Sequence, residues 1–200
     1  MIDPMPGGTS PCLAVYMAAN HGSHPKYAEM AAALGAELGR RHIALVYGGG
    51  NVGLMGTVAD ACLAAGGHVT GVITEQLADR EVVHRGLNEL HIVSTMHQRK
   101  AMMNALADGI ITLPGGFGTL DEMFEALTWV QLGLAQTPVV LLDVDGFWDT
   151  MFAALDTMTT AGFVRPEHRS LARRATTVDE AIELALTPIG ELPAKWVDRG

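Results

Sequence analysis

Short apolar runs alternate with stretches of helical periodicity along most of the chain. Several runs have the length and β-branched content of strands, at 12–17, 43–48, 68–73, 89–93, 109–114 and 138–143. Helical patterns lie near 25–40, 53–66, 95–107, 119–135 and 147–161, and a last one near 178–186 follows ATTV (175–178), a possible seventh strand. Strands that are apolar throughout are typical of a sheet covered on both faces. The alternation predicts an α/β fold, a doubly wound parallel sheet of about seven strands with helices on both faces.

One domain accounts for the length of the chain. Its 200 residues suit a single core, and no repeat, low-complexity tract or linker divides them. We expect a flexible leader over 1–11, a single domain over 12–188 and a C-terminal tail over 189–200. We also expect no signal peptide and no membrane contact, because no apolar run reaches the ~18 residues of a transmembrane helix. Cys12 and Cys62 imply no disulfide framework, so a cytoplasmic location is expected.

The acidic balance of the chain limits its partners. A formal net charge of -9 argues against nucleic-acid binding, which needs clustered Lys and Arg, but a few local donors suffice for one small phosphate. The histidines show no metal-ligand spacing and there is no C-x-x-C pair, so neither a metal site nor a cofactor is expected. His97 fits either a place in a cleft or a local role on the surface.

The ligand-binding edge of a doubly wound sheet lies beyond the carboxyl ends of its strands. The loops that reach it here are 18–24, 48–56, 74–86 and 114–119, with the 94–100 turn beside them. We therefore expect the binding residues on these segments.

The stretch YGGGNVGLMG (47–56) contains the dinucleotide pattern G-x-G-x-x-G. It opens the second βα unit rather than the first, and Glu75 is the only acid near the place where a ribose-binding residue is needed. The glycines fit either a tight turn with close helix packing or a loop that contacts a nucleotide. We expect Gly49, Gly50 and Met55 to contact a nucleotide, but no NAD site.

The stretch LPGGFGTLDE (113–122) is the clearer sign of anion binding. Its glycines permit positive φ angles and a close approach of a ligand to the backbone: Gly115, Gly116 and Gly118. The helix that follows presents unpaired N–H groups and the positive end of its dipole. The lysine of a Walker A loop is missing, which disfavours ATP hydrolysis.

Glu122 has two interpretations. Thr119 and Glu122 have capping-box spacing, with Thr119 as N-cap, and an acid in the first turn suits the helix dipole by about 0.3–1 kcal/mol. Taken alone, the pattern favours this structural role. Alternatively, Glu122 points along the cleft and acts on a ligand.

Arg99 and Lys100 stand where structural reasoning predicts acids. Thr95 and Gln98 also have capping-box spacing, which places both cations in or near a first helical turn, where the dipole disfavours them. Either they bind an anion or pair with Glu122, or they form a solvated basic face.

The stretches MHQRKAMM (96–103) and LPGGFGTLDEMFEALTWVQLG (113–133) together resemble the Lonely Guy family, cytokinin riboside 5'-monophosphate phosphoribohydrolases. The family hallmark is P-G-G-x-G-T-x-x-E with an upstream M-H-x-R-K. The match extends through GGGNVGLMG, Arg80–Glu81 and PVVLLDVDGFWDTM, over most of 12–165. Related proteins carry an old "lysine decarboxylase" label, which we discount because the chain has only Lys26, Lys100 and Lys195 and no evident pyridoxal-phosphate site.

The resemblance implies a Rossmann-like, nucleotide-processing homodimer, or a higher oligomer, that cleaves the N-glycosidic bond of a nucleoside 5'-monophosphate. It implies that Arg99 and Glu122 are catalytic and that Glu81 lies near the base or ribose. Further substrate contacts are expected from Lys100, Gly115, Gly116, Phe117, Gly118, Thr119, Leu120, Asp121 and Thr128.

The sequence departs from the family pattern at two places. Asp121 stands where Glu is usual, and MAANHGSHPKY (17–27) replaces a C-G-S-S-type loop, so Ala18, Ala19 and Asn20 remove hydroxyl donors. The alternatives to a hydrolase are a nucleotide or cofactor carrier without catalysis and a dinucleotide oxidoreductase. Helix 119–135, apolar on more than one side, is the candidate dimer face.

Overall fold

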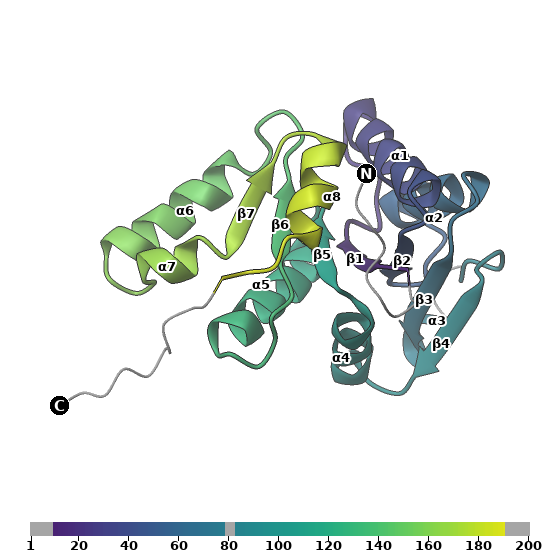
Figure 1. The fold of residues 1–200 in the computed structure, drawn as a ribbon. Helices are drawn as coiled ribbons and strands as arrows, with labels where there is room; N and C mark the ends of the chain where they lie inside the picture. The colour runs from purple at the N-terminus through teal and green to yellow at the C-terminus, as the bar shows by residue number, and fades with distance from the viewer. Residues whose placement is uncertain (1–9, 79–82, 191–200) are drawn as a thin grey trace.

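A single seven-stranded sheet forms the centre of the molecule (Figure 1). The structure is a computed structural model that describes residues 10–78 and 83–190. All pairings between neighbouring strands are parallel, and their order is β4-β3-β2-β1-β5-β6-β7. The strands are β1 (Cys12–Tyr16), β2 (Ala44–Tyr47), β3 (Val69–Thr74), β4 (Glu89–Val93), β5 (Gly109–Thr112), β6 (Val139–Leu142) and β7 (Ala172–Ala175). The strand order reverses between β1 and β5, which confirms the predicted doubly wound sheet.

Helices follow the strands in the predicted alternation. The longer ones are α1 (Pro25–Arg40), α2 (Gly53–Ala64), α4 (Met96–Leu106), α5 (Phe117–Gln131), α6 (Asp149–Thr160) and α8 (Val178–Leu186). Two four-residue helices, α3 (Glu75–Ala78) and α7 (Pro166–Arg169), were not predicted. Such single turns are too short to show helical periodicity.

The seventh strand lies three residues earlier than predicted, at Ala172–Ala175 rather than 175–178. Arg173 and Arg174 interrupt its apolar pattern, although both side chains have partners. Arg173 donates to carbonyls at the end of α8, and Arg174 pairs with Asp143. Thr177, which the prediction placed in the strand, instead caps α8 by accepting from the Glu180 N–H.

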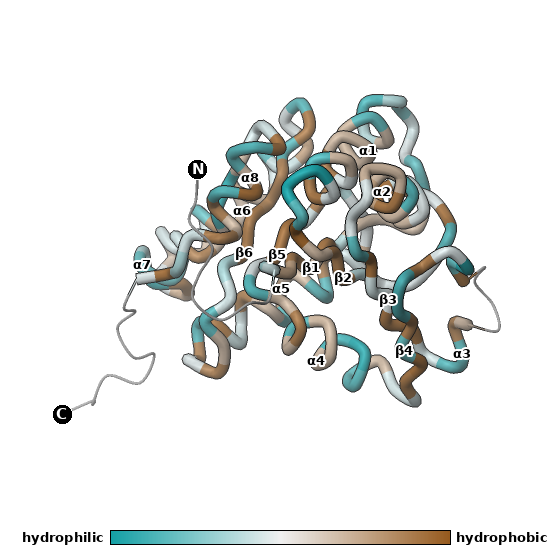
Figure 2. The backbone as a smooth tube through the Cα atoms, turned by 45° about the vertical axis from the view of Figure 1, so that its right-hand side comes forward, coloured by the Kyte–Doolittle hydropathy of each residue, from teal (hydrophilic) through white to brown (hydrophobic). Residues whose placement is uncertain are grey.

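Alternating side chains of each strand pack against different helices. Leu13 and Val15 of β1 belong to a core cluster with α1, α2 and α8, whereas Ala14 and Tyr16 belong to a cluster with α4, α5 and α6. Hydrophobic residues follow the central strands in Figure 2, and hydrophilic residues lie mainly on the outer turns. Helices therefore cover both faces, as predicted. No helix within the described residues is long and apolar enough to cross a membrane.

Candidate active site

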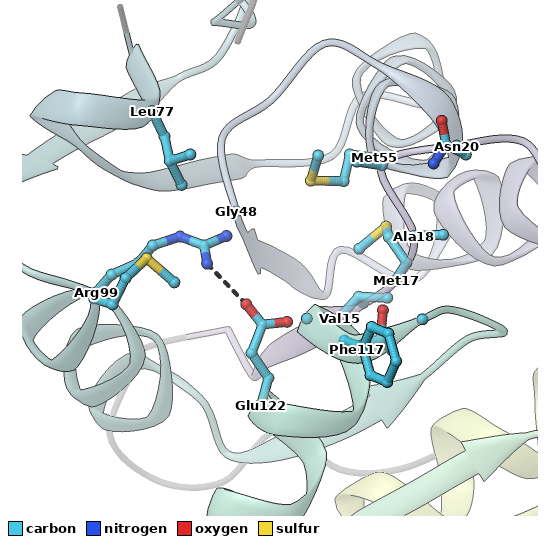
Figure 3. A pocket seen from close by; sticks show the side chains of 15 residues that line it. Val15, Met17, Ala18, Asn20, Gly48, Met55, Leu77, Arg99, Phe117 and Glu122 are labelled. Atoms are coloured by element: carbon cyan, nitrogen blue, oxygen red, sulfur yellow. Dashed lines mark hydrogen bonds and ion pairs between the residues drawn. The ribbon is translucent and has the colours of Figure 1, made fainter. Parts of the chain in front are cut away.

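A cavity of about 350 Å³ opens at the carboxyl edge of the sheet, where the strand order reverses (Figure 3). All four predicted loops contribute to it. Its walls come from the loop after β1 (Ala18, Ala19, Asn20), Gly48 after β2, Leu77 of α3, Met96 and Arg99 of α4, and Gly116, Thr119 and Glu122 at the start of α5. The fold thus places one cavity where loops distant in sequence meet.

Arg99 and Glu122 form an ion pair inside this cavity. The Arg99 Nη1 group donates to Glu122 Oε1 at 2.8 Å, and Arg99 Nε donates to the Val72 carbonyl at 2.9 Å. The two residues are only 7% and 8% exposed, so the charges are little screened by solvent. Figure 3 shows the pair reaching from α4 and α5 toward one another across the cavity. The pair joins the two sequence motifs directly.

Burial and the neighbouring charges change the acidity of Glu122. Burial raises the pKa of Glu122 above its ordinary value, and the nearby Arg99 charge opposes this shift without cancelling it. A carboxylate with a raised pKa accepts a proton more readily than an exposed one when it is ionised. Such a group suits a general base or a partner for a developing positive charge.

The contacts at the start of α4 explain why this helix end tolerates the cations Arg99 and Lys100. Thr95 and Gln98 form the predicted capping box, which satisfies the first N–H groups of the helix. Arg99 and Lys100 are then both buried rather than solvated, so the alternative of a basic surface face is wrong. Each cation has acidic partners on α5, and these offset the unfavourable helix dipole.

Gly48 provides the space that Arg99 occupies. A Cβ atom at this position would collide with Arg99 Nη2, which is fixed by the hydrogen bonds of its guanidinium. Sequence reasoning attributed the glycines of this loop to a turn or a nucleotide contact and missed this role. The position of Gly48 after a strand end marked it as part of the binding edge. Its steric role could not be read from the sequence, because Arg99 lies 51 residues further along the chain.

The first glycine loop only partly reaches the cavity. Met55 lines it, as predicted, whereas Gly49 and Gly50 do not. Gly49 has a φ of +77° and packs beside Ile73, and Gly50 accepts a hydrogen bond from the Tyr47 hydroxyl. These contacts fit a tight turn, so the role predicted for Gly49 and Gly50 as nucleotide contacts gains no support from their position.

The start of α5 differs from the prediction. Gly116 is the N-cap and the helix begins at Phe117, so the predicted capping box of Thr119 and Glu122 is wrong. Thr119 instead packs its hydroxyl against Gly115, where a Cβ atom would collide with it. Glu122 therefore reaches Arg99 rather than back to the helix end.

The glycines of this motif, Gly115, Gly116 and Gly118, do not adopt the positive φ angles that glycine permits. Gly116 and Gly118 instead leave open space where a side chain would stand. Both line the cavity with Phe117, whose side chain is 94% exposed. The unpaired N–H groups of this helix end are therefore open to an anion in the cavity.

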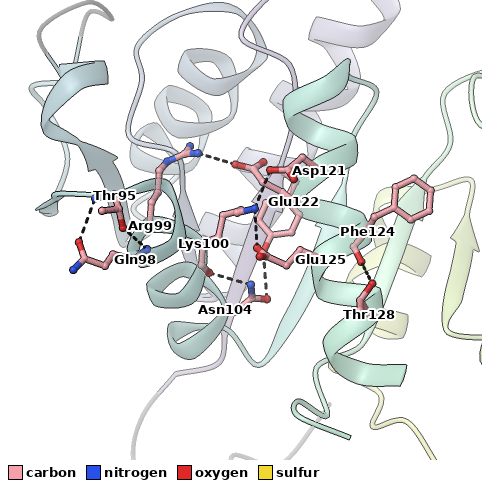
Figure 4. A network of polar contacts seen from close by, with 11 residues as sticks. Thr95, Gln98, Arg99, Lys100, Asn104, Asp121, Glu122, Phe124, Glu125 and Thr128 are labelled. Atoms are coloured by element: carbon pink, nitrogen blue, oxygen red, sulfur yellow. Dashed lines mark hydrogen bonds and ion pairs between the residues drawn. The ribbon is translucent and has the colours of Figure 1, made fainter. Parts of the chain in front are cut away.

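Several predicted substrate contacts lie outside the cavity walls. Lys100 pairs with Asp121 and Glu125 behind them (Figure 4). Leu120 packs against the core, and Gly115 lines a neighbouring hollow of about 230 Å³. Thr128 lies about two helical turns beyond Leu120 on α5, and its hydroxyl donates a hydrogen bond to the Phe124 carbonyl. Glu81 lies outside the described residues.

Comparisons with known proteins identify the family of this chain. A family model described as "Possible lysine decarboxylase" matches residues 55–185. Cytokinin riboside 5'-monophosphate phosphoribohydrolase LOG7 of Arabidopsis thaliana is 44% identical over 85% of this chain and 78% of its own. The enzyme with the same descriptive name from Rhodococcoides fascians is 42% identical over 90% of this chain and 91% of its own. The chain belongs to the LOG family.

The LOG family fold is also found in solved structures of low sequence identity. A molybdenum cofactor binding protein from Rippkaea orientalis has a TM-score of 0.67 and 23% identity over 89% of this chain and 96% of its own. The molybdenum cofactor carrier protein of Chlamydomonas reinhardtii has a TM-score of 0.66 and 19% identity over 88% and 95%. At these identities the likeness shows the Rossmann-like fold alone.

Two structural details bear on cofactors and metals. Lys26 and Lys100, the lysines within the described ranges, are both ion-paired, Lys26 with Asp145 and Lys100 with α5. Among residues 10–78 and 83–190, no three His, Cys, Asp or Glu side chains gather in a way that would hold a metal ion.

In the loop that departs from the family pattern, Asn20 alone brings a polar side chain to the cavity beside Ala18 and Ala19.

Proposed function

We propose that the protein hydrolyses the N-glycosidic bond of cytokinin riboside 5'-monophosphates, and of AMP, to the free base and ribose 5-phosphate. The observation that carries this proposal is the buried Arg99–Glu122 ion pair, which faces the same cavity as the N-terminus of α5. Phosphoribohydrolases that are 42–45% identical over most of the chain support the same reaction.

The cavity has room for the two ends of such a substrate. The N–H groups at the start of α5 bind the 5'-phosphate, because a helix N-terminus carries unpaired donors and partial positive charge. Phe117, Gly118 and Thr119 place these groups along one wall. With the phosphate held there, the ribose C1' carbon lies against Glu122. The phosphate contact favours nucleotides over free nucleosides.

Glu122 performs the chemical step. As the base leaves, positive charge of oxocarbenium type develops at C1', and an adjacent carboxylate stabilises it. The same carboxylate orients the attacking water and accepts its proton, so that water adds to C1', and the base departs with the bonding electrons and takes up a proton from solvent. Arg99 holds Glu122 in place and keeps it ionised at the pH of catalysis.

A second copy of the chain and a cytoplasmic setting complete the proposal. The exposed apolar residues of α5 and the turn after it, Phe124, Leu132 and Leu134, support a homodimer. Cys12 and Cys62 are both free thiols, which is usual in a reducing compartment.

The test is a product assay with AMP, isopentenyladenosine 5'-monophosphate and adenosine. We expect chromatography to show free base and ribose 5-phosphate from both nucleotides, and much less base from adenosine. Glu122→Gln serves as the inactive control for contaminating hydrolases. Binding without products would instead favour a carrier, and an absorbance change that depends on NAD would favour an oxidoreductase.

A further inference from the structure

A second cluster of charges lies directly behind the Arg99–Glu122 pair (Figure 4). Lys100 Nζ donates a hydrogen bond to Asp121 Oδ2 at 3.0 Å and forms an ion pair with Glu125 Oε2 at 3.1 Å. Lys100 is 7% exposed and stands outside the walls of the cavity. A lysine buried in this way is held by its carboxylates rather than displayed to a ligand.

The two carboxylates are not equivalent. The Asp121 side chain is 59% exposed, whereas that of Glu125 is 20% exposed. An exposed ion pair is screened by water and contributes little to positioning, but a half-buried one is screened much less. Asp121 accepts a hydrogen bond from Lys100, but the ion pair with Glu125 is the less screened of the two and therefore holds Lys100 more strongly.

The polar network continues from Lys100 to the sheet. Asn104 Nδ2 donates to the Lys100 carbonyl at 3.0 Å, and the Tyr16 hydroxyl donates to Asn104 Oδ1 at 3.3 Å. Tyr16 is buried at the end of β1. Lys100 is thereby tied to β1 through its backbone and to α5 through its side chain.

The catalytic pair depends on the same two helices. Arg99 precedes Lys100 on α4, and Glu122 follows Asp121 on α5, so both ion pairs join the same turns. A shift of α4 against α5 that broke the Lys100–Glu125 contact would also separate Arg99 from Glu122.

We infer that Glu125 is a positioning residue, which holds Lys100 beside Glu122 and out of the cavity and so keeps Arg99 and Glu122 aligned. This inference rests on the proposed hydrolase function. It assigns Lys100 a role behind the cavity wall, whereas the family resemblance predicts a direct substrate contact.

The charges around Glu122 give this arrangement a measurable consequence. Arg99 and Lys100 of α4 lower the pKa of Glu122, while Asp121 on its own helix raises it. Tyr16 of β1 is near Glu122 as well but is neutral, since burial raises the pKa of its hydroxyl far above the working pH range. If Lys100 moves away, the pKa of Glu122 rises further.

The experiment uses Glu125→Gln, Lys100→Met and the double variant in the full chain. Glu37→Gln is the matched control, because Glu37 is a similarly buried, ion-paired carboxylate on α1, remote from the cavity. Turnover of AMP is measured across pH, and the pKa of Glu122 is read separately by carboxyl-carbon NMR, with Glu122→Gln to assign the signal.

We expect Glu125→Gln to lower kcat on the order of 10-fold, with KM nearly unchanged. The pKa of Glu122 should rise in Glu125→Gln as in Lys100→Met, and Glu37→Gln should match the wild type. In the Lys100→Met background, Glu125→Gln should have no further effect on kcat, because it acts through Lys100.

Multiplying effects in the double variant, or an unchanged or lowered pKa of Glu122 in Glu125→Gln, would overturn the inference. Base release by neither the wild type nor any variant would instead reject the proposed function, and the NMR titration would still decide the role of Glu125.

Discussion

The guanidinium of Arg99 lies 2.8 Å from the carboxylate of Glu122, across 23 residues of sequence, and both groups are buried at the wall of the cavity. The charges satisfy one another before a substrate arrives, so the site is organised in advance. Removing either charge should therefore impair catalysis, and removing Arg99 should lower stability as well, because Glu122 and the Val72 carbonyl of β3 then lose their partner.

Glu122→Gln should lower base release by about 10²–10⁴-fold, the usual contribution of a positioned acid–base group. Arg99→Ala should have a similar effect and in addition destabilise the fold by about 3–5 kcal/mol, because it leaves a buried carboxylate without its partner. Turnover of AMP and urea denaturation of the same samples measure the two effects. Near-wild-type turnover by either folded variant would reject the catalytic assignment.

Gly48→Ala should disable the site without replacing a charged residue. The added methyl group would displace the Arg99 guanidinium, and a misplacement of about 1 Å costs about 10²-fold in rate. We expect a large fall in kcat together with a lower thermal midpoint, because the displaced guanidinium no longer pairs fully with the buried Glu122 carboxylate. Gly190→Ala is the control, since a Cβ atom there meets open space. Full activity of Gly48→Ala would show that Arg99 adapts.

The sheet could be predicted from the sequence because its strands are apolar runs of consistent length. The exception, β7, was displaced because Arg173 and Arg174 satisfy their charges through partners far along the chain. The pattern of hydrophobic residues along the chain does not show which distant group will pair with a charged side chain. The same limit applies to the start of α5, where Thr119 has the spacing of a cap but packs against Gly115.

The Arg99–Glu122 pairing was one of the alternatives that the sequence allowed, because cations at the start of α4 required an explanation. The burial of Lys100 was not predictable, since its partner Glu125 lies on a different helix and has ordinary helical spacing. Gly48 was similarly hidden, because the steric reason for a glycine there is a side chain from another helix.

The pH profile of the enzyme should reflect the burial of Glu122. The pKa of this group is raised above its ordinary 4.5, so the acid limb of kcat/KM should lie above that pH, with activity rising as Glu122 loses its proton. In the folded state the proton is bound more tightly than in the unfolded state. The contribution of Glu122 to stability is therefore greatest below pH 4.5 and declines as the pH rises through the folded-state pKa.

Two measurements check this sign. One is kcat/KM for AMP across pH, for which a limb at or below 4.5 would contradict the raised pKa. The other is the difference in thermal midpoint between the wild type and Glu122→Gln, which should become less favourable to the wild type as the pH rises above 4.5.

Thr128 and the apolar residues near it make a prediction about assembly. In one chain Thr128 is exposed and outside the cavity, so it can meet a substrate only across an interface with a second copy. Leu134, which is 72% exposed just beyond α5, is the most exposed large apolar residue beside it. We expect the wild type to have twice the 21.2 kDa mass of one chain in light scattering, and Leu134→Asp to reduce this mass.

Ile92→Asp is the matched control for Leu134→Asp, because Ile92 is also exposed but lies on β4, at the far edge of the sheet. It should leave the mass unchanged. If the interface brings Thr128 to the substrate of the partner, Thr128→Ala should raise KM in the dimer, and Leu134→Asp should raise it as well. A monomeric wild type with full activity would mean that one chain suffices and that Thr128 has no part in binding.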